Sequence, residues 1–181
     1  MKEEWASIRP DPRVIELPEE DAEAFALYRT WIYTGQLAIL PEPSYPSAPA
    51  PALEEVDQHY HTLAYAYVLG EHLLDKQFKN AIADVYVLYA RGMPPSSRYY
   101  PSHEEIRILY DGTGPNSPIR QLLVDIWYCR GKHEWIDENA DLPKEFLTRV
   151  VKELLRVKPN NKGADALSRP WKLEHQQYHE K

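Results

Sequence analysis

Three side chains in the C-terminal half of the chain have the types and the spacing of metal ligands. Cys129 and His133 are four residues apart, so a helix would bring them to one side, and Asp137 continues the same spacing. A thiolate, an imidazole and a carboxylate together can bind zinc, but Gly131 interrupts the helix and structural zinc sites usually have four ligands in paired clusters. A metal-dependent enzyme that uses these residues is therefore the third and least favoured function, and we expect no metal and no cofactor.

Two other groups of reactive side chains are better explained by structure than by chemistry. His59 and His61 are two residues apart on a predicted helix and point in different directions, so they are not expected to share a metal. Glu19, Glu20 and Asp21 are adjacent carboxylates at a predicted helix start, where they complement exposed N–H groups and nothing separates their pKa values. The sequence therefore predicts a protein that is not an enzyme.

Charge and composition restrict the partners and the compartment. The formal net charge of −7 at pH 7 repels nucleic acid and anionic membrane surfaces, so neither is expected as a partner. One cysteine in 181 residues excludes an internal disulfide and is typical of a reducing compartment. No stretch reaches the ~20 apolar residues of a membrane span, and the first residues lack the apolar core of a signal peptide. We expect an intracellular protein of the cytoplasm or the nucleus.

Residues 14–35 read VIELPEEDAEAFALYRTWIYTG and predict a strand that leads into a helix. Val14, Ile15 and Leu17 form a short β-branched and aliphatic run before a proline, which cannot continue a ladder. From Asp21 the apolar residues follow a helical period, and a glycine supplies the stop. The side chains expected to face inward on this helix are Ala24, Phe25, Leu27, Tyr28, Trp31 and Ile32.

The next segments predict helices separated by proline-rich connections. Residues 40–52 contain five prolines between positions 41 and 51, which predicts an exposed insert. Residues 54–74 and 78–92 carry apolar side chains at three- and four-residue spacing, and the short connection between them predicts a helical hairpin. Residues 96–157 predict further helices, with a capping box at Ser102. The tyrosines expected to pack within the hairpin and its interfaces are Tyr60, Tyr65, Tyr67, Tyr86 and Tyr89.

The two ends of the chain lack a sustained apolar period. Residues 1–13 are polar and predict a lead-in segment, and residues 158–181 predict a disordered tail. Trp171 is the odd residue of this tail, and a lone aromatic side chain in such a segment is more often without a role than an anchor for a partner.

The order of a strand, an LPEED helix start, an apolar helix and WIYTG resembles the middle of the BTB/POZ domain, in the fungal group that couples it to a helical extension. LAYAYVLGEHLLDKQFKNAI resembles the helix pair that follows in that family, and NSPIRQLLVDIWYCRG and LPKEFLTRVVKELL resemble the extension. The resemblance implies an α+β, mostly α-helical fold, with a partial BTB/POZ domain over residues 14–95 and a helical extension over 96–157. Family members have a β-hairpin and two helices before the matched strand, whereas 13 residues precede Val14 here, so we expect an N-terminally truncated domain.

The resemblance also implies a function. BTB/POZ domains are non-enzymatic protein-interaction modules that dimerise and, in many members, bring substrates to a cullin scaffold of ubiquitin ligases. We therefore expect protein partners, either copies of the same chain or a cullin scaffold, and a subordinate expectation is a ubiquitin-ligase substrate adaptor. A lone strand leaves N–H and C=O groups unpaired, which predicts Val14, Ile15 and Leu17 as protein-interaction residues. The alternative is an all-helical structural or scaffold subunit unrelated to ubiquitin.

Overall fold

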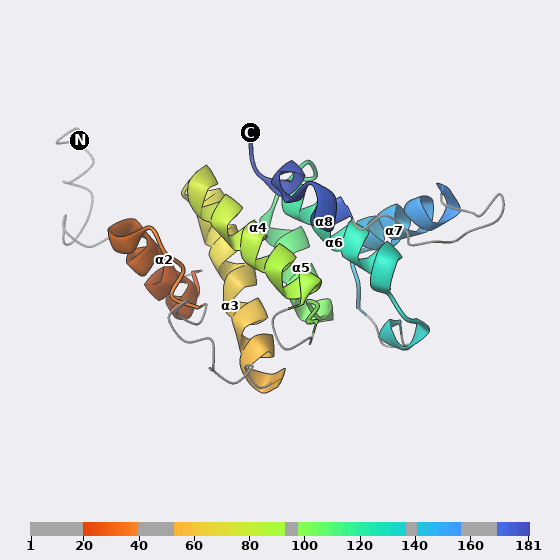
Figure 1. The fold of residues 1–181 in the computed structure, drawn as a ribbon, viewed down its shortest axis with the longest axis horizontal. Helices are drawn as coiled ribbons and strands as arrows, with labels where there is room; N and C mark the ends of the chain where they lie inside the picture. Colours follow the sequence, from red (N-terminus) through yellow and green to blue (C-terminus); the bar gives the residue numbers. More distant parts are fainter. Residues whose placement is uncertain (1–19, 40–52, 93–97, 137–140, 157–169) are drawn as a thin grey trace, which may run out of the picture.

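The computed structural model describes residues 20–39, 53–92, 98–136, 141–156 and 170–181, and every regular element in these ranges is a helix (Figure 1). The α-helices are α2 (Ala22–Thr34), α3 (Leu53–His72), α4 (Lys76–Arg91), α5 (His103–Gly112), α6 (Pro118–Arg130), α7 (Lys144–Arg156) and α8 (Pro170–Leu173), and the 3₁₀ helices are η1 (His133–Trp135) and η2 (His175–Tyr178).

The predicted α+β class is wrong, because no strand or sheet occurs in the described ranges. A strand needs a second strand to pair its backbone N–H and C=O groups, and no described segment offers one. The apolar side chains of these segments recur instead at three- and four-residue spacing, which lets each helix bury one face. The predicted strand residues Val14, Ile15 and Leu17 lie outside the described residues.

Local signals set where the helices begin and end. The Asp21 and Asp75 carboxylates cap α2 and α4, each accepting a hydrogen bond from the backbone N–H three residues ahead, at 2.8 and 3.0 Å. The predicted capping box at the start of α5 is confirmed, with the Ser102 N–H donating to the Glu105 carboxylate over 2.6 Å. Gly35 ends α2 with a φ of 66°, a left-handed conformation that favours glycine.

The centre of the molecule is the hairpin of α3 and α4, which lie side by side with α2 against one side and α5 and α6 on the other (Figure 1). Tyr60, Tyr67, Tyr86 and Tyr89 are almost completely buried in and around it, as predicted, whereas Tyr65 is only partly buried. The Tyr60 ring packs edge to face on the Tyr86 and Tyr89 rings, with centroids 5.0 and 5.2 Å away. Aromatic packing therefore holds the interior of the hairpin.

A buried arginine joins the helices that follow the hairpin. The Arg120 side chain of α6 is only 5% exposed, donates to Thr113 Oγ1 over 3.0 Å and to the Tyr110 carbonyl over 2.5 Å, and pairs with Glu145 of α7 over 2.9 Å. Its guanidinium also lies 4.4 Å from the centroid of the Tyr110 ring. A buried charge is tolerated when its hydrogen bonds are satisfied, so Arg120 fixes α5, α6 and α7 relative to one another.

The C-terminal segment, residues 170–181, is not a disordered tail. It packs against α4 and α6, and Trp171 and Tyr178 are completely or almost completely buried. The Tyr178 hydroxyl donates to the buried carboxylate of Asp125 over 2.6 Å, and Arg91 donates to the Trp171 carbonyl over 2.6 Å. The prediction of disorder over 158–181 is therefore wrong for this part, since burial of widely spaced anchors does not require an apolar period.

The last residues of the segment complete a buried ion cluster. Lys79 of α4 is 5% exposed, and its ammonium group lies 2.5 Å from the Glu71 carboxylate and 3.0 Å from that of Glu180. Burial disfavours its charged form, but the hydrogen bonds and charges of the two glutamates outweigh burial and raise the Lys79 pKa. Glu180 also accepts a hydrogen bond from the Tyr67 hydroxyl over 3.2 Å. The segment thus supplies a carboxylate that the hairpin requires.

Replacing Trp171 with alanine should lower the free energy of unfolding by about 3–5 kcal/mol, because it opens a cavity beneath the C-terminal segment. Urea unfolding followed by far-UV circular dichroism measures the loss. The matched control is Gln177→Ala, a change at an exposed side chain of the same segment. Equal unfolding midpoints for the two variants would show that Trp171 does not anchor the segment.

The buried tyrosines predict instability at alkaline pH. Burial raises the pKa of Tyr60 and Tyr86 well above the ordinary value, so the unfolded chain ionises before the folded chain does. Stability is fully present below the unfolded pKa of about 10 and is lost as the pH rises above it. The raised pKa of Lys79 acts in the same direction. Tyrosinate absorbance should therefore appear together with the loss of helical circular dichroism.

A matched pair of variants tests this origin. The Tyr86 hydroxyl is buried and has no hydrogen-bond partner, so Tyr86→Phe should preserve stability at neutral pH and reduce its loss at alkaline pH. Tyr33→Phe, at a side chain that is 85% exposed, should leave the profile unchanged. Identical alkaline profiles for wild type and Tyr86→Phe would contradict the assignment.

Candidate interaction surface

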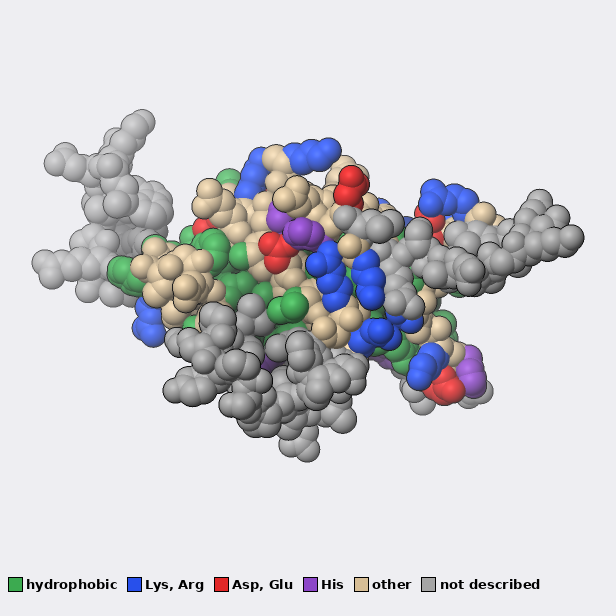
Figure 2. Space-filling model, in the orientation of Figure 1, with side chains coloured by type: hydrophobic (Ala, Val, Ile, Leu, Met, Phe, Trp, Pro, Cys, Tyr) green, Lys and Arg blue, Asp and Glu red, His purple; other side chains and the backbone are tan. Residues whose placement is uncertain are grey.

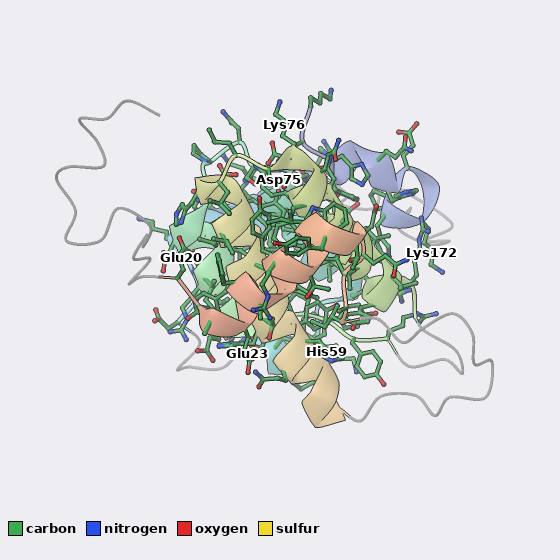
Figure 3. The ribbon with its side chains drawn as sticks, turned by 90° about the vertical axis from the view of Figure 1, so that its left-hand side faces the viewer. Glu20, Glu23, His59, Asp75, Lys76 and Lys172 are labelled. Atoms are coloured by element: carbon green, nitrogen blue, oxygen red, sulfur yellow. The ribbon has the colours of Figure 1, made fainter. Side chains whose placement is uncertain are left out.

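Helix α2 is anchored to the hairpin along one side. Ala24 and Leu27 are buried against the core, and the Tyr28 and Trp31 rings pack on Phe78 of α4 with centroids 4.8 and 5.9 Å away. The Tyr28 hydroxyl also reaches the Asp75 carboxylate that caps α4, at 3.4 Å. Figure 3 views the molecule from this side, with α2 in front of α3 and α4. The helix is therefore held in a fixed orientation.

The opposite side of α2 carries large apolar residues that the described core leaves uncovered. Phe25 is 44% exposed, Ile32 59% and Tyr33 85%, and the exposed Arg29 lies between them on the same side of the helix. We call these four residues the α2 stripe. Figure 2 shows hydrophobic side chains on the surface at this end of the molecule.

The exposure of two of these residues corrects a prediction. Phe25 and Ile32 were expected to face inward with the rest of the apolar residues of α2, and that expectation is wrong. Among the described elements α2 packs chiefly on the α3–α4 hairpin, so it buries only the side that faces the hairpin. Periodicity identifies an apolar side chain on a helix but does not say whether a second neighbour exists to cover it.

A shallow groove of about 320 Å³ runs beside the stripe, between α2 and the first half of α3. It is lined by Glu23, Ala26, Leu27, Arg29, Thr30, Ala38, Ile39, Gln58, His59 and Thr62. Glu23 accepts hydrogen bonds from Gln58 and Thr62, both over 3.2 Å, so its carboxylate is already occupied. Figure 3 shows Glu23 and His59 on the neighbouring helices α2 and α3. This combination suits binding better than proton transfer, which needs a carboxylate or imidazole directed at a reacting group.

The two histidines of α3 are half-buried and contact different neighbours. His59 Nδ1 lies 3.0 Å from the Tyr89 hydroxyl, whereas His61 Nδ1 lies 3.6 Å from the Glu105 carboxylate. The two imidazoles are therefore directed at different helices, α4 and α5.

The candidate metal ligands Cys129 and His133 do not share a helix. Helix α6 ends at Arg130, so the half-buried Cys129 and the exposed His133 do not belong to one helix. His133 lies instead 3.6 Å from Glu134, and Asp137 lies outside the described residues. Within the ranges that the structure describes, no group of three or more His, Cys, Asp or Glu side chains is placed to hold a metal ion.

Comparison of the chain with family models, with curated proteins and with solved structures finds no match. The resemblance to BTB/POZ domains therefore stays a prediction from the sequence. In the described part of the chain, no helix has both the length and the apolar content needed to cross a membrane.

The two sides of α2 should respond differently to truncation. Leu27→Ala removes a buried side chain and should lower the free energy of unfolding by about 2–5 kcal/mol, whereas Ile32→Ala should change it by less than about 0.5 kcal/mol. Urea unfolding of both variants measures the difference. A loss at Ile32 as large as that at Leu27 would mean that the α2 stripe is covered within the chain and is not a surface.

Proposed function

We propose that this protein is a non-enzymatic protein-interaction module that binds a partner protein through the α2 stripe. The observation that carries the proposal is the exposure of Phe25, Ile32 and Tyr33 on a helix whose other side is locked into the core. Buried apolar area contributes roughly 25 cal/mol per Å², so covering these three side chains is a substantial source of affinity. Tyrosine, phenylalanine and arginine are also enriched in protein interfaces.

Arg29 defines the chemistry of the partner. It forms no ion pair within the described residues, and it lies among the apolar side chains of the stripe. A partner that covers the stripe needs a carboxylate for this guanidinium, because a charge that is buried without a partner costs several kcal/mol. The partner surface is therefore apolar with at least one acidic residue facing Arg29.

The fixed position of α2 lowers the cost of binding. Tyr28 and Trp31 pack on Phe78, so the helix does not have to become ordered when the partner arrives. Pre-organised surfaces lose less conformational entropy on association, which leaves more of the apolar gain as affinity.

Two more specific functions follow from different observations. The resemblance of the sequence to BTB/POZ proteins supports a ubiquitin-ligase substrate adaptor with a cullin scaffold as its partner. The helical architecture of the described residues supports a structural or scaffold subunit unrelated to ubiquitin. The identity of the protein that binds the α2 stripe distinguishes the two.

The test is affinity purification of the chain from an extract of its own source, with wild type, Ile32→Asp and Leu155→Asp compared side by side. Leu155 of α7 is 55% exposed, close to the 59% of Ile32, so it controls for a carboxylate placed on an exposed apolar residue. A partner recovered in near-stoichiometric amount should be lost with Ile32→Asp and kept with Leu155→Asp.

The outcome also separates the specific functions. A cullin recovered through the α2 stripe would support the adaptor, and a different single partner would support the scaffold subunit. Binding that is equal for wild type and Ile32→Asp would overturn the proposed function, provided that circular dichroism shows both chains to be folded.

A further inference from the structure

A second surface of different chemistry lies where α4, α6 and α8 meet. Two contacts show how the C-terminal segment lies along α4. Glu180 contacts Asn80 near the start of α4, and Trp171 contacts Arg91 at the end of that helix. On α6, Tyr178 contacts Asp125, within the second half of the helix. The segment therefore runs antiparallel to α4, and α8 lies beside the last turn of α4 while also contacting α6.

Each element that meets there brings a cation. Arg91 ends α4, Arg130 ends α6 and Lys172 belongs to α8, and Arg98 donates to the Arg91 carbonyl over 3.5 Å. Arg91 also donates to the Lys172 carbonyl over 3.3 Å. We call these four residues the α8 basic patch. Figure 2 shows Lys and Arg side chains gathered on this face of the molecule.

The arginines of the patch are not neutralised by carboxylates of the described chain. Arg91 is held by backbone carbonyls, which leave its charge in place, and neither Arg98 nor Arg130 forms an ion pair among the described residues. Such a concentration of positive charge is unexpected in a chain with a net charge of −7. By contrast, the two cations that are buried in the described chain, Lys79 and Arg120, both contact glutamates.

Arg130 is the cation of the patch whose hydrogen bonds are least satisfied. Its Nε and Nη2 atoms are shielded from solvent and have no hydrogen-bond partner. Leaving buried donors of a charged group unsatisfied costs about 1–3 kcal/mol or more, and a carboxylate can bind two guanidinium N–H groups at once. The helix dipoles at the ends of α4 and α6 favour cations but supply no acceptor for these two atoms.

We propose that the α8 basic patch binds an acidic peptide segment of a partner protein. Neighbouring glutamate or aspartate side chains of one segment would pair with the exposed Arg98 and with the partly exposed Arg91 and Arg130. Because two donors of Arg130 are shielded, its side chain has to turn outward for a carboxylate to reach them. Long polyanions such as nucleic acid, and anionic membranes, present charge to the whole molecule, and the net charge of −7 repels them. A short acidic segment is small enough to contact only the patch, where the nearby charges are positive. This surface is separate from the α2 stripe and does not depend on it.

The test uses the full chain and a fluorescein-labelled octaglutamate peptide, with binding followed by fluorescence anisotropy at low and at moderate salt. Wild type should bind the peptide, and higher salt should weaken binding because the contacts are ionic. Arg98→Gln and Arg130→Gln should each reduce affinity by about tenfold, the effect of one lost charge pair of ~1.4 kcal/mol. Since Arg98 is exposed, its variant keeps the test valid if Arg130→Gln fails to fold.

Lys144→Gln and Lys152→Gln on α7 are the matched controls, because each removes one positive charge from an exposed side chain elsewhere. They should bind octaglutamate as wild type does, and Ile32→Asp should also bind it normally. The proposal is overturned if octaglutamate does not bind, if the α7 controls lose as much affinity as Arg98→Gln, or if single-stranded RNA or phosphatidylserine vesicles bind the patch more tightly than the peptide.

Discussion

The buried ammonium of Lys79 is the interaction on which the arrangement of the described helices depends most. A lysine that is 5% exposed cannot remain charged without carboxylates, and Glu71 and Glu180 supply them from α3 and from the C-terminal segment. Glu180 also accepts a hydrogen bond from the Tyr67 hydroxyl. That hydroxyl lies 3.3 Å from Ser117 Oγ at the start of α6. One charge thereby links the hairpin, the following helices and the end of the described chain.

The contacts of Glu180 also determine where the beginning of the C-terminal segment lies. Because Glu180 is fixed near the start of α4, the preceding residues lie along the helix, with His179 Nε2 2.9 Å from the Asp84 carboxylate. Trp171 then reaches Arg91, and α8 completes the basic surface. The patch therefore exists only while the segment is in place, so its charge is a product of tertiary structure and is not visible as a run of basic residues in the sequence.

The features of the fold that the sequence predicts correctly are those set by residues close together in the chain. The start of α2 at Asp21, its end at Gly35 and the capping box at Ser102 involve neighbours within four residues, and the sequence predicts them. The α+β class failed because it relied on a strand whose partner had to come from elsewhere. Phe25 was wrongly assigned to the core for a related reason. The spacing of apolar residues predicts a helix, but it does not show how many other helices pack against it.

The C-terminal segment shows the limit most clearly. Trp171 and Tyr178 are seven residues apart, and five of the six residues between them are polar, which is a composition typical of disorder. Its order comes from contacts with residues about 50 to 100 positions earlier, such as Asp125 and Asn80. No local pattern encodes these contacts, although two large aromatic residues in an otherwise polar segment are a signal that could have suggested anchoring.

Helix α4 connects the two surfaces proposed for binding. Phe78 supports α2 and its neighbour Lys79 holds the C-terminal segment, while Arg91 at the far end of the helix belongs to the basic patch. Adjacent residues of a helix point about 100° apart, so one turn of α4 serves both sides of the molecule without the two sides touching. Coupling between distant sites requires an element with two alternative arrangements, and a helix packed on aromatic side chains and ion pairs offers one arrangement. The stripe and the patch should therefore bind their partners independently, which suits a module that holds two proteins together at the same time.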